Sequence, residues 1–509
     1  MKRVLMVVMM GALAAEAAEV KVRFSPTPQS VTMLSEARVN VNAAPIDIRC
    51  PDEAAVGWVR KMLKVWLKDL AIPEVKAAAP GEKQVHGPEA YQLKVAAGRV
   101  EITADTLQGV RYAMYTYRQA WEAGRGTARL THYTAPELKV DDWPSLKFRG
   151  IHFCWFRTDE GVTVKFMEHQ LRMAAYCKFN YAVVEQWGGL RSERHPELCF
   201  SEKGTAPMSE LRRLAELARD LGITVIPMMN MIGHASLAGQ GYGKHAALDA
   251  RPELQPLFEP DNGWDWCLTN EHTVKLQQEL IAELAEACGN PPYFHIGGDE
   301  SRWPSCSTCC AAPYAKTLAA HLTALNDFLK SRKMRMMMWH DGLLPGGDPR
   351  FKGFWCNGAA CAGEILEALP RDVVICDWYY GGCWGAAERP EAYTTMDHFR
   401  KLGFEVVTCP WYNRNAAAGQ SAYACKQGIK GLLMTTWARN YGEKYSLNWS
   451  HGPSDAWGTA EGKAAPAPCD FDVFTHWRQC GWDMGLKPAD EEEFGFVSSQ
   501  FSRVPEHID

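Results

Sequence analysis

The order of apolar and polar residues divides the chain into two parts. In the first part, short strand patterns are mixed with two helical patterns, over residues 52–70 and 108–123. Residues 91–104, YQLKVAAGRVEITA, alternate apolar and polar side chains around a glycine, which predicts a β-hairpin. We therefore expect a small α+β accessory domain over residues 19–142, which ends at the Trp-Pro pair of residues 143–144.

After this boundary, short apolar runs alternate with amphipathic segments of helical length, as in parallel βα units. The runs are residues 148–155, 180–186, 224–230, 293–299, 335–341, 373–379, 405–411 and 431–437. Eight such runs predict an α/β fold, a closed (β/α)8 TIM barrel over residues 143–441, with active groups on the loops after the strand C-termini. A doubly wound open sheet is the alternative, but no Gly-rich phosphate loop follows the first run. We expect residues 442–509 to form an extension packed on the barrel.

The ends of these runs combine polar groups with aromatic rings. The candidate site residues there are Arg157, Glu185, Asn230, His234, Asp299, Glu300, Trp339, Asp341, Trp378, Trp411, Tyr412 and Trp437. A single tryptophan in such a place more often belongs to the core, but its repetition in successive units favours a binding wall. Sugars present flat C–H faces and a rim of hydroxyls, so aromatic walls and charged groups suit them.

An acidic pair, Asp299 and Glu300, follows two glycines in the segment FHIGGDE. Glycines permit unusual backbone angles, which suits a tight functional turn. Paired carboxylates in an apolar enclosure push their pKa values apart, so that one can stay protonated as a general acid. The alternative for an adjacent Asp-Glu pair is a solvated helix start.

The segment FHIGGDE resembles the catalytic signature of glycoside hydrolase family 20, the β-N-acetylhexosaminidases. RGIHFCWFR is similar to the family's first-strand motif, whose final arginine, here Arg157, grips sugar hydroxyls. MNMIGHA, with His234, resembles the family's loop after the third strand, and CPWY, with Trp411 and Tyr412, resembles its Trp-Tyr pair. The tryptophans that the resemblance places around the terminal sugar are Trp339, Trp378 and Trp437.

The resemblance implies an exo-acting enzyme that releases terminal β-GlcNAc or β-GalNAc from glycans and needs no cofactor. Its retaining mechanism is substrate-assisted, because the 2-acetamido oxygen of the sugar is the nucleophile and an oxazolinium ion is the intermediate. Glu300 would act as general acid and then as base. Asp299 would accept a hydrogen bond from the acetamide N–H, and Tyr412 would hold the acetamide oxygen.

The resemblance also assigns supporting roles. Arg157 and Glu185 would bind ring hydroxyls, and His234 would support the carboxylates without reacting; a buried histidine with satisfied hydrogen bonds is the alternative for His234.

Several positions depart from the family pattern. Cys154 replaces an expected aspartate, and Glu185, Gly188 and Gly189 stand where the family has a histidine and two aspartates. Arg439 replaces a glutamate after the last tryptophan. The pattern is closer to the divergent hexosaminidase D branch, and the choice between GlcNAc and GalNAc stays open.

Three other functions compete with this hypothesis. They are a lacto-N-biosidase, an enzyme specific for sulfated hexosamines, and a catalytically silent glycan-binding protein. The acidic pair argues against the last, because a lectin has no need of it.

Charge and the N-terminal pattern bear on partners and location. The 55 basic and 60 acidic residues give a formal charge of -5 with no block of like charges, which disfavours nucleic acid as a partner. Residues 1–18 combine two cations, an apolar stretch and small residues, which predicts a secretory signal and an exported chain, periplasmic or secreted. No later run has the roughly 20 apolar residues of a membrane span.

The chain has 17 cysteines, and three of them follow the acidic pair closely in the segment SCSTCC. Cys306, Cys309 and Cys310 allow a metal site, a local disulfide or free thiols. A CxxC spacing suits zinc, but a structural site wants four ligands, and no second CxxC pair is evident. The sequence therefore assigns no metal.

Overall fold

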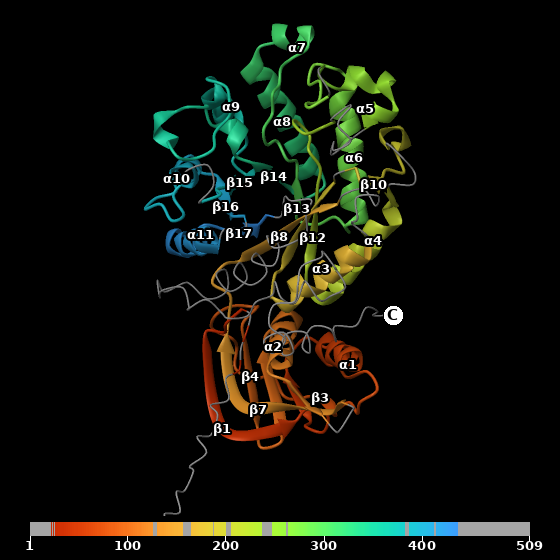
Figure 1. Cartoon of the computed structure of the whole chain (residues 1–509), viewed down its shortest axis with the longest axis vertical. Coiled ribbons are helices and arrows are strands. Elements are labelled where there is room, and N and C mark those ends of the chain that lie inside the picture. The colour runs from red at the N-terminus through yellow and green to blue at the C-terminus, as the bar shows by residue number, and fades with distance from the viewer. Residues whose placement is uncertain are drawn as a thin grey trace, which may run out of the picture.

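The computed structural model describes residues 22–435 except for residues 23, 25, 126–129, 156–163, 187, 200–204, 237–246, 261–262, 382–385 and 412–413. The predicted signal and C-terminal extension lie outside these described residues, as do Arg157, Tyr412 and Trp437. A small N-terminal domain, coloured red to orange, lies next to a larger barrel domain, coloured yellow to blue (Figure 1).

The N-terminal domain is an α+β unit. Its described strands form a sheet in the order β1-β7-β4-β5-β2-β3, with β6 beside β7. The elements are β1 (Ser30–Asn40), β2 (Ile46–Arg49), α1 (Ala54–Leu67), β3 (Val75–Ala77), β4 (Tyr91–Ala96), β5 (Arg99–Ala104), α2 (Leu107–Gln119), β6 (Glu122–Arg125) and β7 (Leu130–Asp142). The predicted hairpin is confirmed as β4–β5, which turns at Ala97 and Gly98, both with positive φ, and pairs Leu93 with Ile102.

The second domain is a closed parallel barrel in the order β12-β13-β14-β15-β16-β17-β8-β9. Its strands are β8 (Phe148–Trp155), β9 (Tyr181–Gln186), β12 (Thr224–Met228), β13 (Tyr293–His295), β14 (Arg335–Trp339), β15 (Val374–Trp378), β16 (Glu405–Cys409) and β17 (Gly431–Met434). Its helices are α3 (Val164–Tyr176), α4 (Met208–Leu221), α5 (Ala247–Ala250), α6 (Thr273–Ala287), α7 (Ser307–Ala311), α8 (Tyr314–Ser331), α9 (Ala362–Ala368), α10 (Thr394–Lys401) and α11 (Arg414–Gln427). Short strands β10 (Leu190–Arg191) and β11 (Ala206–Pro207) and four 3-10 turns (Pro196–Leu198, Pro252–Leu257, Asp341–Leu343 and Pro349–Phe351) lie in its loops. The predicted barrel is confirmed, and no described helix is long and apolar enough to cross a bilayer.

Most barrel strands end before the apolar runs that predicted them. The run that ends at residue 299 contains a strand of only three residues, β13, because Gly297 and Gly298 adopt positive φ angles of 71° and 92°. In the described chain, most of these runs continue past the strand into the following loop. The loop residues include Asn230, Asp299 and Asp341, whereas Glu185, Trp339 and Trp378 lie in the strands themselves.

Aromatic side chains fill the N-terminal end of the barrel. Phe148, Tyr181 and Tyr293 are the first residues of their strands. The rings of Phe148 and Tyr181 stack with centroids 4.5 Å apart, and Tyr293 packs edge-on against both. A site inside the barrel therefore opens at the opposite end, where the strands terminate.

Buried ion pairs join the two domains. Lys178, which is fully buried, donates to Asp142 at 2.8 Å and to the Tyr91 hydroxyl at 3.0 Å. Arg149 makes a two-pronged contact with Glu89, at 2.7 and 3.1 Å. Because an unpaired buried charge is costly, these contacts fix the barrel on the N-terminal domain.

Candidate active site

The acidic pair lies on a tight turn after β13. Gly297 is required there because a Cβ atom would lie 1.8 Å from the Asn230 side-chain oxygen. Glu300 itself has a φ of 49°, in the left-handed region that non-glycine residues rarely adopt. Such a backbone angle is typical of functional turns.

The two carboxylates have different surroundings. The Asp299 side chain is 10% exposed, whereas the Glu300 side chain is 47% exposed. His234 Nε2 lies 3.4 Å from an oxygen of each carboxylate and therefore bridges them. One acid is thus held in the wall of the site, and the other can reach a ligand.

A loop between β12 and α6 supports this arrangement. The Trp264 ring packs on the His234 ring with centroids 4.2 Å apart, and its Nε1 donates to the Glu300 carbonyl oxygen at 2.9 Å. Asp265 accepts hydrogen bonds from Ser301 Oγ at 2.6 Å and from the Arg302 backbone N–H at 3.0 Å. The backbone from the Glu300 carbonyl to Arg302 is therefore held by one loop.

Asp341 lies beneath the turn and is fully buried. It accepts hydrogen bonds from the Glu300 backbone N–H at 2.9 Å and from Trp378 Nε1 at 3.1 Å. Burial, followed by the nearby charge of Asp299, raises the pKa of Asp341 to about 7. These contacts couple the acidic turn after β13 to the Trp378 side chain of β15.

Aromatic rings continue from Trp378 along one side of the barrel mouth. Trp378 stacks on Tyr380 with centroids 4.9 Å apart, Tyr380 contacts Trp411 at 5.2 Å, and Trp355 lies 6.0 Å from Trp378. Trp355 is 44% exposed. Trp378 and Tyr380 are buried, so the faces on which a sugar ring can stack come from Trp355 and Trp411.

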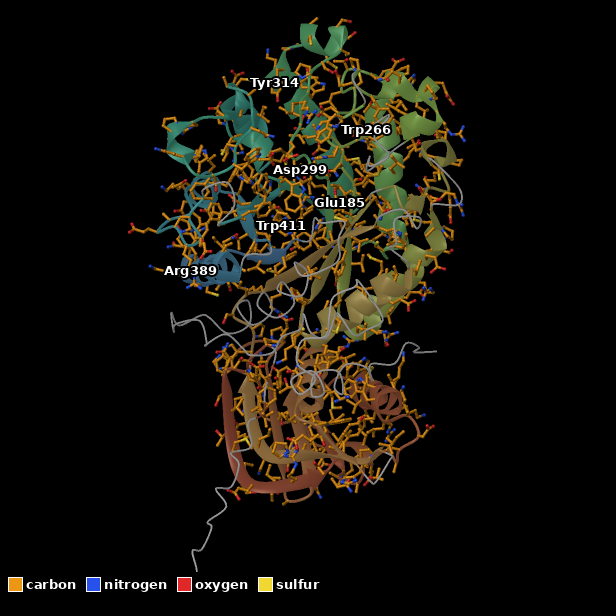
Figure 2. The ribbon with its side chains drawn as sticks, viewed as in Figure 1. Glu185, Trp266, Asp299, Tyr314, Arg389 and Trp411 are labelled. Atoms are coloured by element: carbon orange, nitrogen blue, oxygen red, sulfur yellow. The ribbon has the colours of Figure 1, made fainter. Side chains whose placement is uncertain are left out.

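Glu185 and Trp339 lie deeper in the barrel. Glu185 is fully buried; it accepts a hydrogen bond from Asn230 at 2.6 Å and lies 2.9 Å from His152 Nε2. Trp339 packs against His295 with centroids 4.3 Å apart and is also fully buried. Figure 2 labels Glu185, Asp299 and Trp411 on the barrel domain.

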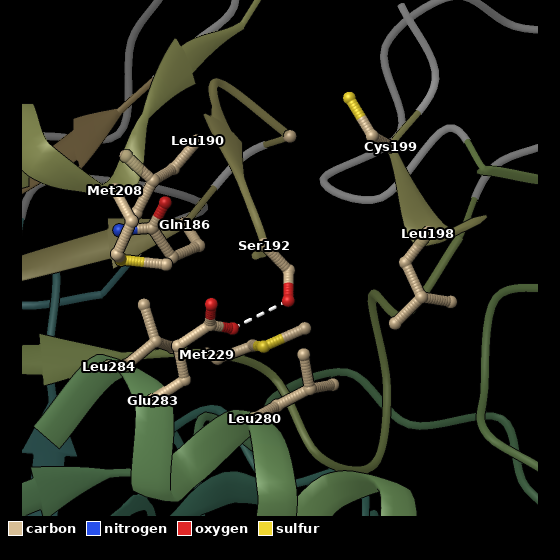
Figure 3. A pocket seen from close by; sticks show the side chains of 11 residues that line it. Gln186, Leu190, Ser192, Leu198, Cys199, Met208, Met229, Leu280, Glu283 and Leu284 are labelled. Carbon is tan, nitrogen blue, oxygen red and sulfur yellow. Dashed lines mark hydrogen bonds between the residues drawn. The ribbon is translucent and has the colours of Figure 1, made fainter. Parts of the chain in front are cut away.

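The loop after β9 is fixed to the outside of the barrel. Glu283 of α6 accepts hydrogen bonds from Ser192 Oγ and from the Glu193 backbone N–H, at 2.5 and 2.6 Å. The adjoining pocket, with a volume of about 50 Å³, is lined mainly by apolar side chains such as Leu280 and Met229 (Figure 3). This pocket lacks both carboxylates of the acidic pair and is too small for a sugar.

Known proteins share this architecture. A model of the glycosyl hydrolase family 20 catalytic domain matches residues 180–446, more than half of the chain, and a model of domain 2 of the same family matches residues 21–143. The chain belongs to glycosyl hydrolase family 20. The family resemblance of the sequence is thereby confirmed.

Individual relatives of this family 20 chain are distant. The chain is 27% identical over 341 residues to the probable beta-hexosaminidase fdl of Drosophila melanogaster, covering 64% of the chain and 48% of the relative. It is 26% identical over 249 residues to a beta-hexosaminidase of Porphyromonas gingivalis, covering 43% of the chain and 30% of the relative. The chain therefore spans half or less of the length of these relatives.

Solved structures support the fold. A chitobiase from Flavobacterium johnsoniae superposes with a TM-score of 0.66 at 17% identity, covering 94% of this chain and 72% of that one. A beta-N-acetylhexosaminidase from Bacteroides fragilis gives a TM-score of 0.64 at 17% identity, covering 90% of this chain and 94% of that one.

The structure brings together Asp299, Glu300, His234, Asp341 and Trp378, five of the candidate residues of this family 20 chain. Trp411 joins them through the aromatic row. Sequence reasoning missed Trp264, Tyr380 and Trp355. Of these three, only Tyr380 could have been predicted from the sequence as a site residue, since it follows the strand-end tryptophan Trp378 by two residues.

Proposed function

We propose that this chain is an exo-acting β-N-acetylhexosaminidase that removes terminal β-GlcNAc or β-GalNAc from glycans. The observation that carries the proposal is the unequal exposure of the two neighbouring carboxylates, a buried Asp299 and an exposed Glu300 bridged by His234. A substrate that brings its own nucleophile needs one acid-base group and one orienting group, and this pair supplies both.

The reaction starts with attack by the acetamido oxygen of the substrate on its anomeric carbon. Glu300 gives its proton to the leaving oxygen, and the C–O bond to that oxygen breaks. Asp299 accepts a hydrogen bond from the acetamide N–H and stabilises the positive charge of the oxazolinium ion. Glu300 then takes a proton from water, and the resulting hydroxide opens the ring from the original face with net retention.

Substitution of each acid tests the assignment. We expect Glu300→Gln to lower kcat about 10²- to 10⁴-fold on an aryl β-GlcNAc with a poor leaving group. The loss should shrink on a dinitrophenyl glycoside, whose leaving group needs no proton. Asp299→Asn should lose about 3 to 4 kcal/mol of transition-state stabilisation with both leaving groups.

Glu271→Gln, an exposed carboxylate on another loop, is the control and should retain wild-type activity. If Glu300→Gln hydrolyses the glycoside with the poor leaving group at a near-normal rate, Glu300 is not the general acid.

A substrate and inhibitor panel separates the alternatives. An N-acetyl thiazoline, which mimics the cyclised intermediate, should inhibit competitively, and a glycoside without the 2-acetamido group should not react. Release of lacto-N-biose, or strict dependence on a 6-sulfate, would assign one of the rival specificities. Binding of GlcNAc without turnover of any aryl glycoside would assign a silent glycan-binding protein.

We further propose that the chain is exported, on the pattern of residues 1–18. Mass spectrometry of the protein produced in its own host should find the N-terminus near residue 19. An intact N-terminus would contradict export by a cleaved signal.

A further inference from the structure

Three cysteines and a glutamate meet beside the catalytic turn. One ligand atom from each of Glu259, Cys267, Cys306 and Cys309 lies within 4.8 Å of the others. Cys267 Sγ lies 3.7 Å from Cys309 Sγ and 3.9 Å from Cys306 Sγ, and all three cysteines are free. The second ligand pair that the sequence lacked is therefore supplied by Glu259 and Cys267.

These spacings match a tetrahedral metal site. With Zn–S bonds of about 2.3 Å, tetrahedral geometry places two sulfurs about 3.8 Å apart. The Cys309 backbone N–H donates to Cys306 Sγ at 3.2 Å, a contact that stabilises a thiolate at the start of a CxxC turn. Thr269 Oγ1 lies 3.0 Å from Cys309 Sγ and forms a further polar contact around the cluster.

The glutamate is oriented toward the cysteines. Glu259 is almost fully buried, and its Oε2 accepts hydrogen bonds from the backbone N–H groups of Ser305 and Cys306. Its Oε1 is buried and has no backbone donor in the described part of the chain; the side-chain donor toward this carboxylate is the Cys309 thiol itself. Once that thiol is ionised, the buried carboxylate and thiolate need a cation between them.

We propose that Glu259, Cys267, Cys306 and Cys309 bind one structural Zn²⁺ ion. Three thiolates and one carboxylate favour zinc, because soft sulfur ligands in a tetrahedral set select it. On binding, the three thiols release their protons to the solvent. Four protein ligands leave no open position for substrate, so the ion has no part in the sugar chemistry.

The site joins the loop between β12 and α6, which contacts the catalytic turn, to the segment that follows this turn in the chain. Glu259 and Cys267 flank Trp264 and Asp265, which contact Glu300 and the residues after it. Cys306 and Cys309 lie at the start of α7, six and nine residues after Glu300. Zinc would therefore clamp one loop to the other. An effect of this clamp on catalysis depends on the proposed function, whereas the binding of zinc does not.

Metal analysis of the full chain tests the site. We expect about one zinc per chain after exhaustive dialysis, and under about a tenth of that in Cys267→Ser and Cys309→Ser. Cys310→Ser is the matched control, because Cys310 is an exposed neighbour on α7 outside the four ligands, and it should keep its zinc. Less than a tenth of a zinc in the wild type, or full zinc in both ligand variants, would overturn the proposal.

Two measurements remain decisive if the serine variants fold poorly. The Co²⁺-substituted wild type should show thiolate-to-cobalt charge transfer and the intense visible bands of a tetrahedral ion, and Glu259→Gln should shift these bands. A six-coordinate cobalt spectrum, or a disulfide at Cys267, Cys306 or Cys309 in the unreduced protein, would refute the site. Neither readout depends on sugar hydrolysis, so failure of the enzymatic proposal leaves this one testable.

Discussion

A single methyl group at Gly233 is expected to displace the catalytic turn. A Cβ atom there would lie 2.7 Å from the Asp299 carbonyl oxygen and 3.0 Å from Ser301 Cα. Ordinary contacts begin at 3.4 Å, so the closest atom must move by about 0.7 Å. Both neighbouring atoms belong to the backbone, and no flexible side chain can absorb the shift.

The displacement acts on the segment that carries both carboxylates. Because a misplacement of about 1 Å costs about 10²-fold in rate, Gly233→Ala should lower kcat by about 10- to 100-fold. The added volume should also lower the free energy of unfolding by about 1 to 3 kcal/mol, which need not unfold the protein. The assay is kcat and KM on an aryl β-GlcNAc at a temperature well below the melting transition measured by calorimetry.

Gly342→Ala is the matched control for this substitution. A Cβ atom at Gly342 would approach the same turn, but it would meet only the Gly298 carbonyl oxygen, at 3.4 Å. The control should keep kcat within about threefold of the wild type. The reasoning is refuted if Gly233→Ala stays within the same range, or if the two variants lose equal activity.

Three further outcomes are expected. Trp378→Phe keeps an aromatic ring, though a smaller one, and removes the hydrogen bond to Asp341, so kcat/KM should fall about tenfold; an unchanged value would show that this bond does not hold the turn. Burial raises the pKa of Asp377 to about 8 from 3.8, so the native state keeps a proton that the unfolded chain loses, and stability falls as pH rises toward 8. The free energy of unfolding measured in urea should fall with pH more steeply in the wild type than in Asp377→Asn, by up to about 1.4 kcal/mol per pH unit, and parallel curves would contradict this. Lys178→Met removes the buried cation beside Asp142, which keeps the hydrogen bond from the Tyr91 hydroxyl, and should cost about 3 to 5 kcal/mol in urea unfolding. Adding Asp142→Asn should recover part of this loss; if it recovers none, the cost does not come from the uncompensated Asp142 charge.

The barrel was predictable because its signal repeats. Eight apolar runs that alternate with helical segments define a closed parallel sheet, and active groups after the strand C-termini then place Asp299, Asp341 and Trp378 at one end of the barrel. The lengths of the strands were less predictable. An apolar run does not reveal where backbone pairing stops, and β13 ends at His295 because the glycines after it adopt positive φ.

Individual roles at the site were harder to predict than its location. Glu185 was expected to bind sugar hydroxyls, and the structure places it in the interior with His152 and Asn230 as partners. Its hydroxyl-binding role stays a prediction, which now requires one of these contacts to break. Trp264 was missed because it comes from a loop between β12 and α6, where no strand end marks the register.

The cysteine cluster shows why a local motif search fails for sites built across loops. Cys306 and Cys309 form a recognisable CxxC pair, but Glu259 and Cys267 are eight residues apart and of different types. An isolated antiparallel bridge between Phe258 and Trp266 brings their backbones together, and one residue beyond each bridge partner becomes a ligand. The number of residues between two such ligands depends on the length of the loop that the bridge closes, so no fixed sequence spacing identifies them. A sequence search that pairs each CxxC with single cysteines in the loop after the previous barrel strand, here the loop between β12 and α6, would have found Cys267 and placed the site next to the acidic turn.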